Sequence, residues 1–212
     1  MWLVTPPGVF APRSDAGLLL DHALPSVHGE VLDVCTGSGV LALAAAERAA
    51  AVTAVDASRP AVACARANAR LNGRRVHVLH GDLFGPVHGR RFDVVLCNPP
   101  YLPTAAGGRR PLGGDAWEAG EDGRLVLDRL CREVGSHLRP GGWLVMVHSS
   151  LADIDRSVGQ LVEAGLEVDV VGEQEGPLGP LARARLRHLL ERHLVDEADP
   201  REHMVVLRGR RP

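Results

Sequence analysis

The chain reads Glu-Val-Leu-Asp-Val-Cys-Thr-Gly-Ser-Gly-Val from residue 30 to residue 40, and this stretch decides the fold. An apolar run of strand type leads to Asp33, a turn with Gly37 and Gly39 follows, and a helical pattern begins at Val40. Glycines let a backbone pass close to a ligand, and the start of a helix presents free amide N–H groups. We therefore expect a ligand at this turn.

Short β-type runs alternate with helical patterns, which indicates an α/β fold with a doubly wound, mostly parallel sheet covered by helices on both faces. The expected seven strands are Glu30–Cys35, Val52–Asp56, Val76–His80, Phe92–Cys97, Trp143–His148, Leu166–Val171 and His203–Leu207. The expected helices are Asp15–Leu24, capped by Ser14, and Val40–Ala50, Pro60–Leu71, Gly123–Leu138, Asp153–Ala164 and Leu181–Leu194. Loops are expected at Pro103–Gly120, long enough for a functional flap, and at Gly172–Pro180.

The composition indicates one globular domain over residues 1–212. Of its residues, 45% are hydrophobic, which is ordinary for a globular domain, and a chain of this length can bury one sizeable hydrophobic core. There is no apolar run of 18 residues and no signal-peptide pattern at the N-terminus, so we expect no membrane association. The four cysteines are widely spaced, which argues against a zinc ribbon and for a reducing, cytoplasmic location. His77 and His80 fall on opposite faces of a strand, and we expect no metal site. A net charge of −2 disfavours nucleic acid as a partner.

Two acidic residues follow the glycine turn at the positions that a nucleoside-binding sheet needs. Asp56 ends the second expected strand and can accept both ribose hydroxyls. Asp82 follows the third strand and can accept a hydrogen bond from an adenine amine. The pyrophosphate fingerprint is incomplete because residue 42 is alanine, whereas Asp33 at the turn favours a cationic ligand. S-adenosylmethionine, which carries an ammonium and a sulfonium, is therefore the expected cofactor.

The most specific motif is Asn98-Pro99-Pro100-Tyr101, just beyond the fourth expected strand. Two prolines fix the backbone, so that the Asn98 side-chain oxygen and the Pro99 carbonyl can face one cavity as acceptors. A planar NH2 group has two donors to match them, and holding both aims its lone pair at the methyl group. Tyr101 would stack on the planar group. We predict methylation of an amide or aromatic amine nitrogen.

These motifs resemble the class I methyltransferases, and among them the HemK/PrmC-like glutamine methyltransferases that modify peptide-chain release factors. The resemblance spans nearly the whole chain and includes Gly8-Val9-Phe10-Ala11-Pro12-Arg13-Ser14-Asp15 and Trp117-Glu118-Ala119-Gly120-Glu121-Asp122-Gly123-Arg124. It implies a Rossmann-like seven-stranded sheet with an antiparallel last strand. It also implies that the cofactor-binding residues are Asp33, Thr36, Gly37, Gly39, Asp56, Asp82, Leu83 and Asn98. Catalysis would fall to Asn98, Pro99 and Tyr101, and substrate binding to these three residues and Pro100.

The chain departs from the family pattern at two positions and at its N-terminus. Ala16 stands where short members often carry a cofactor-contacting threonine, and Cys35 replaces a glycine found in many. About 29 residues precede the first strand, where long bacterial relatives have a helical domain that grips the release factor. We expect residues 1–29 to contribute to the pocket instead. The short form of archaea and eukaryotes works with a small zinc-binding activator protein, and the resemblance leaves open whether this chain needs such a partner.

Other functions fit part of the pattern. An exocyclic base amine in RNA or DNA presents the same donors as a glutamine amide, and a small-molecule amine could do so too. A protein that only binds S-adenosylmethionine is a further alternative, although such proteins usually lose the catalytic motif. Arg183, Arg185, Arg187 and Arg192 fall on the last helical pattern, where we expect them to form a solvated face, with RNA or an acidic substrate surface as the alternative.

Overall fold

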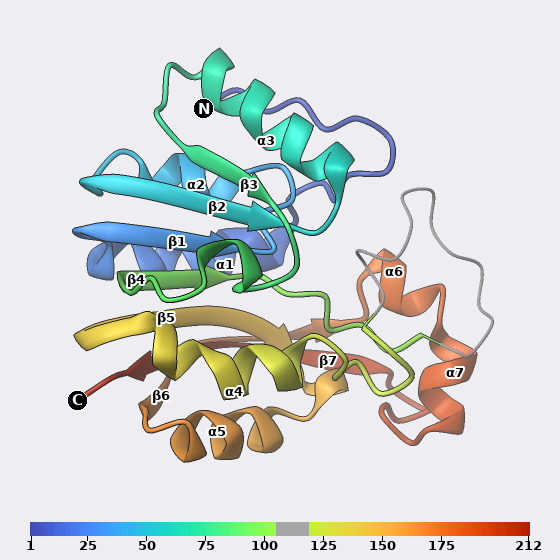
Figure 1. The fold of residues 1–212 in the computed structure, drawn as a ribbon. Helices are drawn as coiled ribbons and strands as arrows, with labels where there is room; N and C mark the ends of the chain where they lie inside the picture. The colour runs from blue at the N-terminus through green and yellow to red at the C-terminus, as the bar shows by residue number, and fades with distance from the viewer. Residues whose placement is uncertain (105–118) are drawn as a thin grey trace.

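The computed structural model describes residues 1–104 and 119–212 and has a seven-stranded sheet at its centre (Figure 1). The strand order is β3-β2-β1-β4-β5-β7-β6, and β7 runs antiparallel to both of its neighbours. This confirms the expected mostly parallel sheet with an antiparallel last strand. The strands are β1 Glu30–Val34, β2 Ala51–Asp56, β3 His77–His80, β4 Phe92–Cys97, β5 Leu138–Ser149, β6 Glu167–Pro177 and β7 Arg201–Arg210.

Six helical regions were expected, and their boundaries differ most near the C-terminus. The helices are α1 Ser14–Ala23, α2 Val40–Ala45, α3 Arg59–Leu71, α4 Leu127–His137, α5 Ile154–Glu163, α6 Pro180–Arg183 and α7 Leu186–Glu191. Short 3-10 turns lie at Leu24–Ser26, Gly85–Val87 and Ser150–Ala152. The cap assigned to Ser14 is wrong, because Arg13 is the N-cap and Ser14 is already helical.

The prediction of a loop at Gly172–Pro180 is wrong for most of this segment. Strand β6 continues to Pro177, because its register with β7 is maintained from Gly172 opposite Val206 to Pro177 opposite Arg201. The two strands form a long antiparallel ribbon at the edge of the sheet, which a polar sequence can adopt without a buried face. Of the other expected loop, Pro103–Gly120, residues 105–118 lie outside the described residues.

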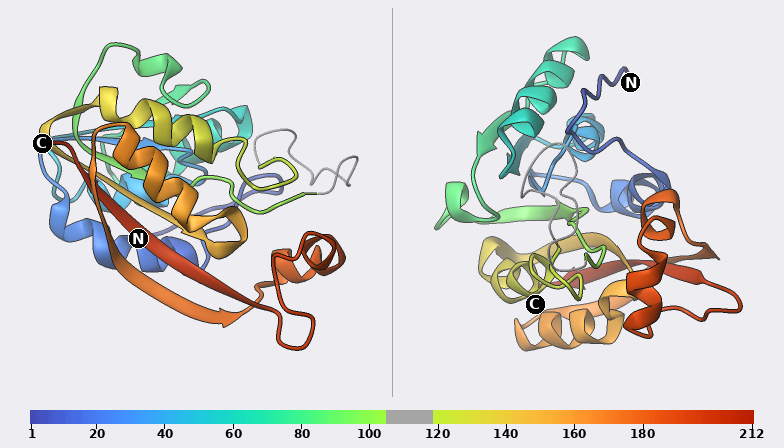
Figure 2. Two further views of the ribbon diagram at one scale, coloured as in Figure 1. Left: turned by 90° about the horizontal axis from the view of Figure 1, so that it is seen from below. Right: turned by 90° about the vertical axis from the view of Figure 1, so that its right-hand side faces the viewer.

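Helices cover both faces of the sheet because the strands alternate apolar side chains between the two. On one face, α1, α2 and α3 pack with Val31, Val94 and Leu96. On the other, α4 and α5 pack with Leu32 and Val95. Figure 2 shows these two helical layers on opposite sides of the strands. None of the helices in the described ranges is long and apolar enough to cross a bilayer.

The parallel pairing of β1 with β4 places two loops side by side. Val34 lies opposite Cys97 in this register, so Cys35 and Asn98 begin the loops that leave the sheet at the same edge. Since β1 also pairs in parallel with β2 on its other side, the order in which successive strands join the sheet reverses at β1. Such a switch point is where open α/β sheets bind ligands.

Gly39 packs α2 against α3. It adopts φ +84°, and a Cβ atom on it would lie 3.1 Å from the Cβ and 3.3 Å from the Cα of Ala65. Helix α2 begins at the next residue, so any side chain here would push the two helices apart.

We predict that Gly39→Ala lowers the free energy of unfolding by about 2–4 kcal/mol, because it combines a left-handed alanine with overpacking. Gly73→Ala is the matched control: its φ is +62°, but no atom lies within 4 Å of the added carbon. Urea unfolding should give the control a loss of only about 1–2 kcal/mol. Equal losses for the two variants would contradict a packing role for Gly39.

His148 is a fully buried histidine on β5. Its Nδ1 lies 3.2 Å from the Ser149 carbonyl oxygen, and its Nε2 has no partner among the described residues. Burial lowers the pKa of His148 from 6.5 to about 4, so the folded protein holds it neutral through the mildly acidic range.

We predict that His148 costs stability as the pH falls, because only the unfolded chain takes up its proton between pH 6.5 and pH 4. The loss reaches about 3 kcal/mol at pH 4, from 1.36 kcal/mol per pKa unit. The free energy of unfolding of wild type minus that of His148→Leu should therefore fall by this amount from pH 7 to pH 4. His28→Leu, a change at an exposed histidine, should leave the wild-type pH dependence in place. A pH-independent difference for His148→Leu would refute the assignment.

Candidate active site

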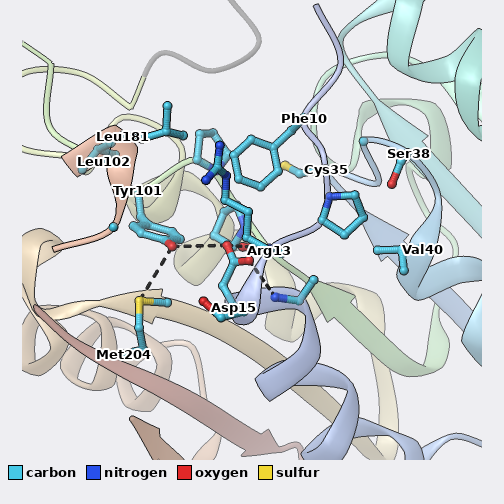
Figure 3. A pocket seen from close by; sticks show the side chains of 18 of the residues that line it. Phe10, Arg13, Asp15, Cys35, Ser38, Val40, Tyr101, Leu102, Leu181 and Met204 are labelled. Atoms are coloured by element: carbon cyan, nitrogen blue, oxygen red, sulfur yellow. Dashed lines mark hydrogen bonds between the residues drawn. The ribbon is translucent and has the colours of Figure 1, made fainter. Parts of the chain in front are cut away.

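A cavity of about 410 Å³ lies at the carboxyl ends of β1, β2 and β4 (Figure 3). Its volume is in the range of small-molecule sites. Its walls come from the segment before α1, the turn after β1, the end of β2, the loop after β4, and the chain from α6 to the start of β7.

The turn after β1 forms one end of the cavity, and its backbone is held from behind by Asp33. Thr36 and Gly37 line the cavity, whereas Asp33 is fully buried and does not. Asp33 Oδ2 accepts hydrogen bonds from Thr36 Oγ1 at 2.5 Å and from the Ala42 amide at 3.0 Å. Its Oδ1 is buried without a partner among the described residues, and burial raises the pKa of Asp33 to about 7. Asp33 therefore holds the turn in place from behind and does not line the cavity.

The two glycines of the turn have different surroundings. Gly37, at φ +55°, faces open space, since the nearest atom to an added Cβ would be the Phe10 carbonyl oxygen at 4.0 Å. Gly39 does not line the cavity and is needed for helix packing. Cys35 does line the cavity and adopts φ +60°, a conformation that costs a non-glycine residue about 1–2 kcal/mol.

Asp56 lies on the cavity wall at the end of β2. Its Oδ2 accepts from the Gly37 amide and its Oδ1 accepts from the Ser58 amide, both at 2.8 Å. Burial raises the pKa of this carboxyl group, but each oxygen keeps a second lone pair for a ligand hydroxyl. The acid therefore connects the turn after β1 to the start of α3.

The structure does not bring Asp82 and Leu83 onto the cavity wall. Strand β3 ends at His80, and Asp82 is an exposed residue whose Oδ2 accepts from Arg129 Nη2 at 2.7 Å. Leu83 adopts φ +44° and buries its side chain in the core beside α4. The predicted adenine contact of Asp82 therefore has no support in this geometry.

Asn98, Pro99, Pro100 and Tyr101 all line the cavity at its other end. Asn98 Nδ2 donates a hydrogen bond to Asp15 Oδ2 at 3.1 Å, and the Tyr101 hydroxyl donates to the same oxygen at 3.3 Å. Burial, followed by the negative charge of Asp15, raises the pKa of Tyr101 well above its usual range. The phenol is therefore a neutral donor, and Figure 3 shows it directed at Asp15.

Sequence reasoning missed several residues of the cavity. Asp15 ends the motif at residues 8–15, but sequence reasoning assigned it no role. An acidic residue in the first turn of a helix is nevertheless a recognisable pattern, because the helix dipole stabilises its charge. The segment from Gly179 to Arg185, with Glu202 and Met204, also lines the cavity, and no local pattern indicated this. These side chains arrive through the long β6–β7 ribbon.

Arg185 corrects the view of the last helical region as a solvated arginine face. Its Nη1 donates to the carbonyl oxygens of Leu102 at 2.9 Å and Pro103 at 3.2 Å, just after the proline motif. Arg183, Arg187 and Arg192 are exposed, as expected. Arg185 instead ties the region of α6 to the loop after β4.

The residues present fit a cationic ligand with a nucleoside part. The open backbone at Gly37 leaves space, Asp56 supplies acceptors for hydroxyl groups, and Phe10, Val40 and Ala61 supply apolar surface. Asp15 and Glu202 add carboxylates towards the other end. One wall thus suits a nucleoside and the other offers hydrogen-bond acceptors.

The chain is similar to proteins that are named as glutamine methyltransferases. A Methanocaldococcus jannaschii protein assigned to the protein N5-glutamine methyltransferases is 33% identical over 177 residues, covering 82% of this chain and 89% of that protein. The release factor glutamine methyltransferase of Geobacter sulfurreducens is 34% identical over 172 residues, covering 76% of this chain but only 60% of its own length.

A similar solved structure is that of the E. cuniculi Mtq2-Trm112 complex, described as responsible for methylation of the eRF1 translation termination factor. It matches with a TM-score of 0.67 and 19% identity, covering 97% of this chain and 99% of that one. This likeness concerns the fold.

The family model described as methyltransferase small domain matches residues 1–108, about half of the sequence. The chain therefore belongs to the methyltransferase small domain family.

Proposed function

We propose that this protein transfers a methyl group from S-adenosylmethionine to the side-chain amide nitrogen of a glutamine in a peptide-chain release factor. The observation that carries the proposal is the meeting of two elements in one cavity. The glycine turn after β1 forms one end, and the Asn98-Pro99-Pro100-Tyr101 loop after β4 forms the other.

S-adenosylmethionine, when bound, supplies an electrophilic methyl group on a sulfonium. Asp56 would accept from the ribose hydroxyls, and the backbone at Thr36 and Gly37 would approach the cofactor closely. Phe10 and Ala61 would cover its apolar surface. Asp33 would act indirectly, by holding the turn in shape through Thr36 and Ala42.

The acceptor loop would bind the NH2 group of the target amide. Asn98 Oδ1 and the Pro99 carbonyl would each accept one N–H, which turns the nitrogen so that its lone pair points at the methyl group. An amide nitrogen delocalises this lone pair, so fixed acceptors that stabilise charge on it are the main help the protein can give. Tyr101, held by Asp15, would form the side of the pocket against the planar group.

The choice of a glutamine in a release factor is supported by the relatives. The Geobacter protein is named for that activity, and the E. cuniculi complex for methylation of a termination factor. We infer a small activating partner by the same analogy, since Mtq2 is found with Trm112. We propose that residues 1–212 form one methyltransferase domain and that it acts in the cytoplasm. The segment before β1 would form part of its pocket.

We predict that purified protein transfers labelled methyl to release factor, and that Asn98→Ala lowers this turnover at least 100-fold while still binding cofactor. The assay compares release factor, ribosomes, total RNA and DNA, each with and without a Trm112-type partner. Asn72→Ala is the matched control, because Asn72 bonds Trp2 at the C-terminal end of α3 and does not line the cavity.

Label found only in nucleic acid would identify the methyl acceptor as a base amine, which presents the same two donors as a glutamine amide. Label in no fraction, with cofactor bound and partner present, would refute the release-factor proposal.

We predict that Asp56→Asn weakens binding of S-adenosylhomocysteine by about 10-fold or more, because a hydrogen bond to a charged acceptor contributes about 1.5–3 kcal/mol. Titration calorimetry measures the change, and Asp155→Asn on the exposed start of α5 is the control for the loss of a charge. Unchanged affinity for Asp56→Asn would remove Asp56 from the cofactor site.

A further inference from the structure

Asp15 is a buried carboxylate in the wall of the cavity. It lies in the first turn of α1 with 6% of its surface exposed. Its Oδ2 accepts from Asn98 and Tyr101, and its Oδ1 accepts from the Ala16 amide at 2.7 Å. Among residues 1–104 and 119–212, no arginine or histidine forms an ion pair with it. Asp15 lies at the N-terminal end of α1, where the helix dipole is positive and stabilises a negative charge.

The carboxylate decides which end of the Asn98 amide faces the target. A side-chain amide has a donor end and an acceptor end of nearly the same shape, and it can turn over by 180°. An ionised carboxylate only accepts, so the NH2 end of Asn98 must face Asp15. The oxygen Oδ1 then faces the other way, and no described residue donates to it. Because Asp15 accepts from the Asn98 NH2 group, the Asn98 oxygen Oδ1 is left to accept a hydrogen bond from the target.

The same oxygen of Asp15 holds Tyr101. Because both donors converge on Oδ2, the ring and the amide are fixed relative to each other across three residues of loop. In Figure 3 the dashed lines from the Tyr101 hydroxyl run to Asp15 and to Met204. Loss of the Asp15 acceptor would release both groups together.

We infer that Asp15 is a positioning residue that orients the Asn98 amide and, through it, stabilises the positive charge that develops on the attacked nitrogen. This inference rests on the proposed function of the loop. As the nitrogen bonds to the methyl carbon, the C–S bond breaks with its electron pair on sulfur, and the nitrogen is cationic until it releases one proton to solvent water. A hydrogen bond from Asn98 to a carboxylate polarises the amide and makes Oδ1 a stronger acceptor for that N–H.

The test compares Asp15→Asn, Asp15→Ala and Asp21→Asn. Asp21 lies on the exposed side of α1, so its variant removes the same charge from the same helix outside the cavity. For release-factor methylation, we expect kcat to fall about 10-fold in Asp15→Asn and about 100-fold in Asp15→Ala, with KM for the acceptor changed less. The dissociation constant of S-adenosylhomocysteine should change by less than about 3-fold, and Asp21→Asn should match wild type.

A second readout needs no methyl acceptor. In nitrogen-edited NMR of the labelled protein, the Asn98 side-chain NH2 resonances, assigned by their loss in Asn98→Ala, should shift in both Asp15 variants and stay in place in Asp21→Asn. Unmoved resonances, or a kcat within 3-fold of wild type in Asp15→Ala, would overturn the inference. If the wild-type protein methylates no release factor but its Asn98 resonances depend on Asp15, the proposed substrate is wrong and the positioning role is kept.

Discussion

The parallel pairing of β1 with β4 is the constraint on which the site depends. The register Val34 opposite Cys97 makes both strands end at the same edge, so the glycine turn and the Asn98 loop start one residue later as neighbours. A slip of one residue would turn every side chain of β4 to the other face and break its alternating contacts with both helical layers. The packing that stabilises the sheet therefore also sets the distance between the two ends of the cavity.

Much of the sheet and half of the cavity could be predicted from the sequence, because the signals are local. Strand β4 was predicted in full, and α3 to within one residue, since Ser58 caps it and Pro60 follows its first residue. Thr36, Gly37 and Asp56 lie close together because one βαβ unit joins them. Asp15 and Asn98, by contrast, meet across 83 residues, and no local periodicity indicates such a contact.

Charges were the least predictable part of the site. Asp33 could be read as a ligand for a cation, yet the structure buries it behind the turn with Thr36 and Ala42 as partners. Asp82 could be read as an adenine acceptor, yet it faces Arg129 on the surface. A carboxylate near a glycine turn can face a ligand, a hydroxyl or backbone amide of the turn, or an arginine. Sequence spacing does not distinguish them, because the choice depends on the direction of the side chain after folding.

The two ends of the cavity are stabilised in different ways, and this bears on how the fold serves different substrates. The cofactor end is a short continuous unit held by its own backbone and by Asp56. The loop after β4 is held by Asp15 of α1 on one side and by Arg185, which lies between β6 and β7 in the sequence, on the other. Both residues are distant from this loop along the chain. Changes in either support can therefore reshape the acceptor pocket without disturbing the cofactor turn. One sheet can therefore keep the turn after β1 unchanged while the loops at the other end of the cavity vary.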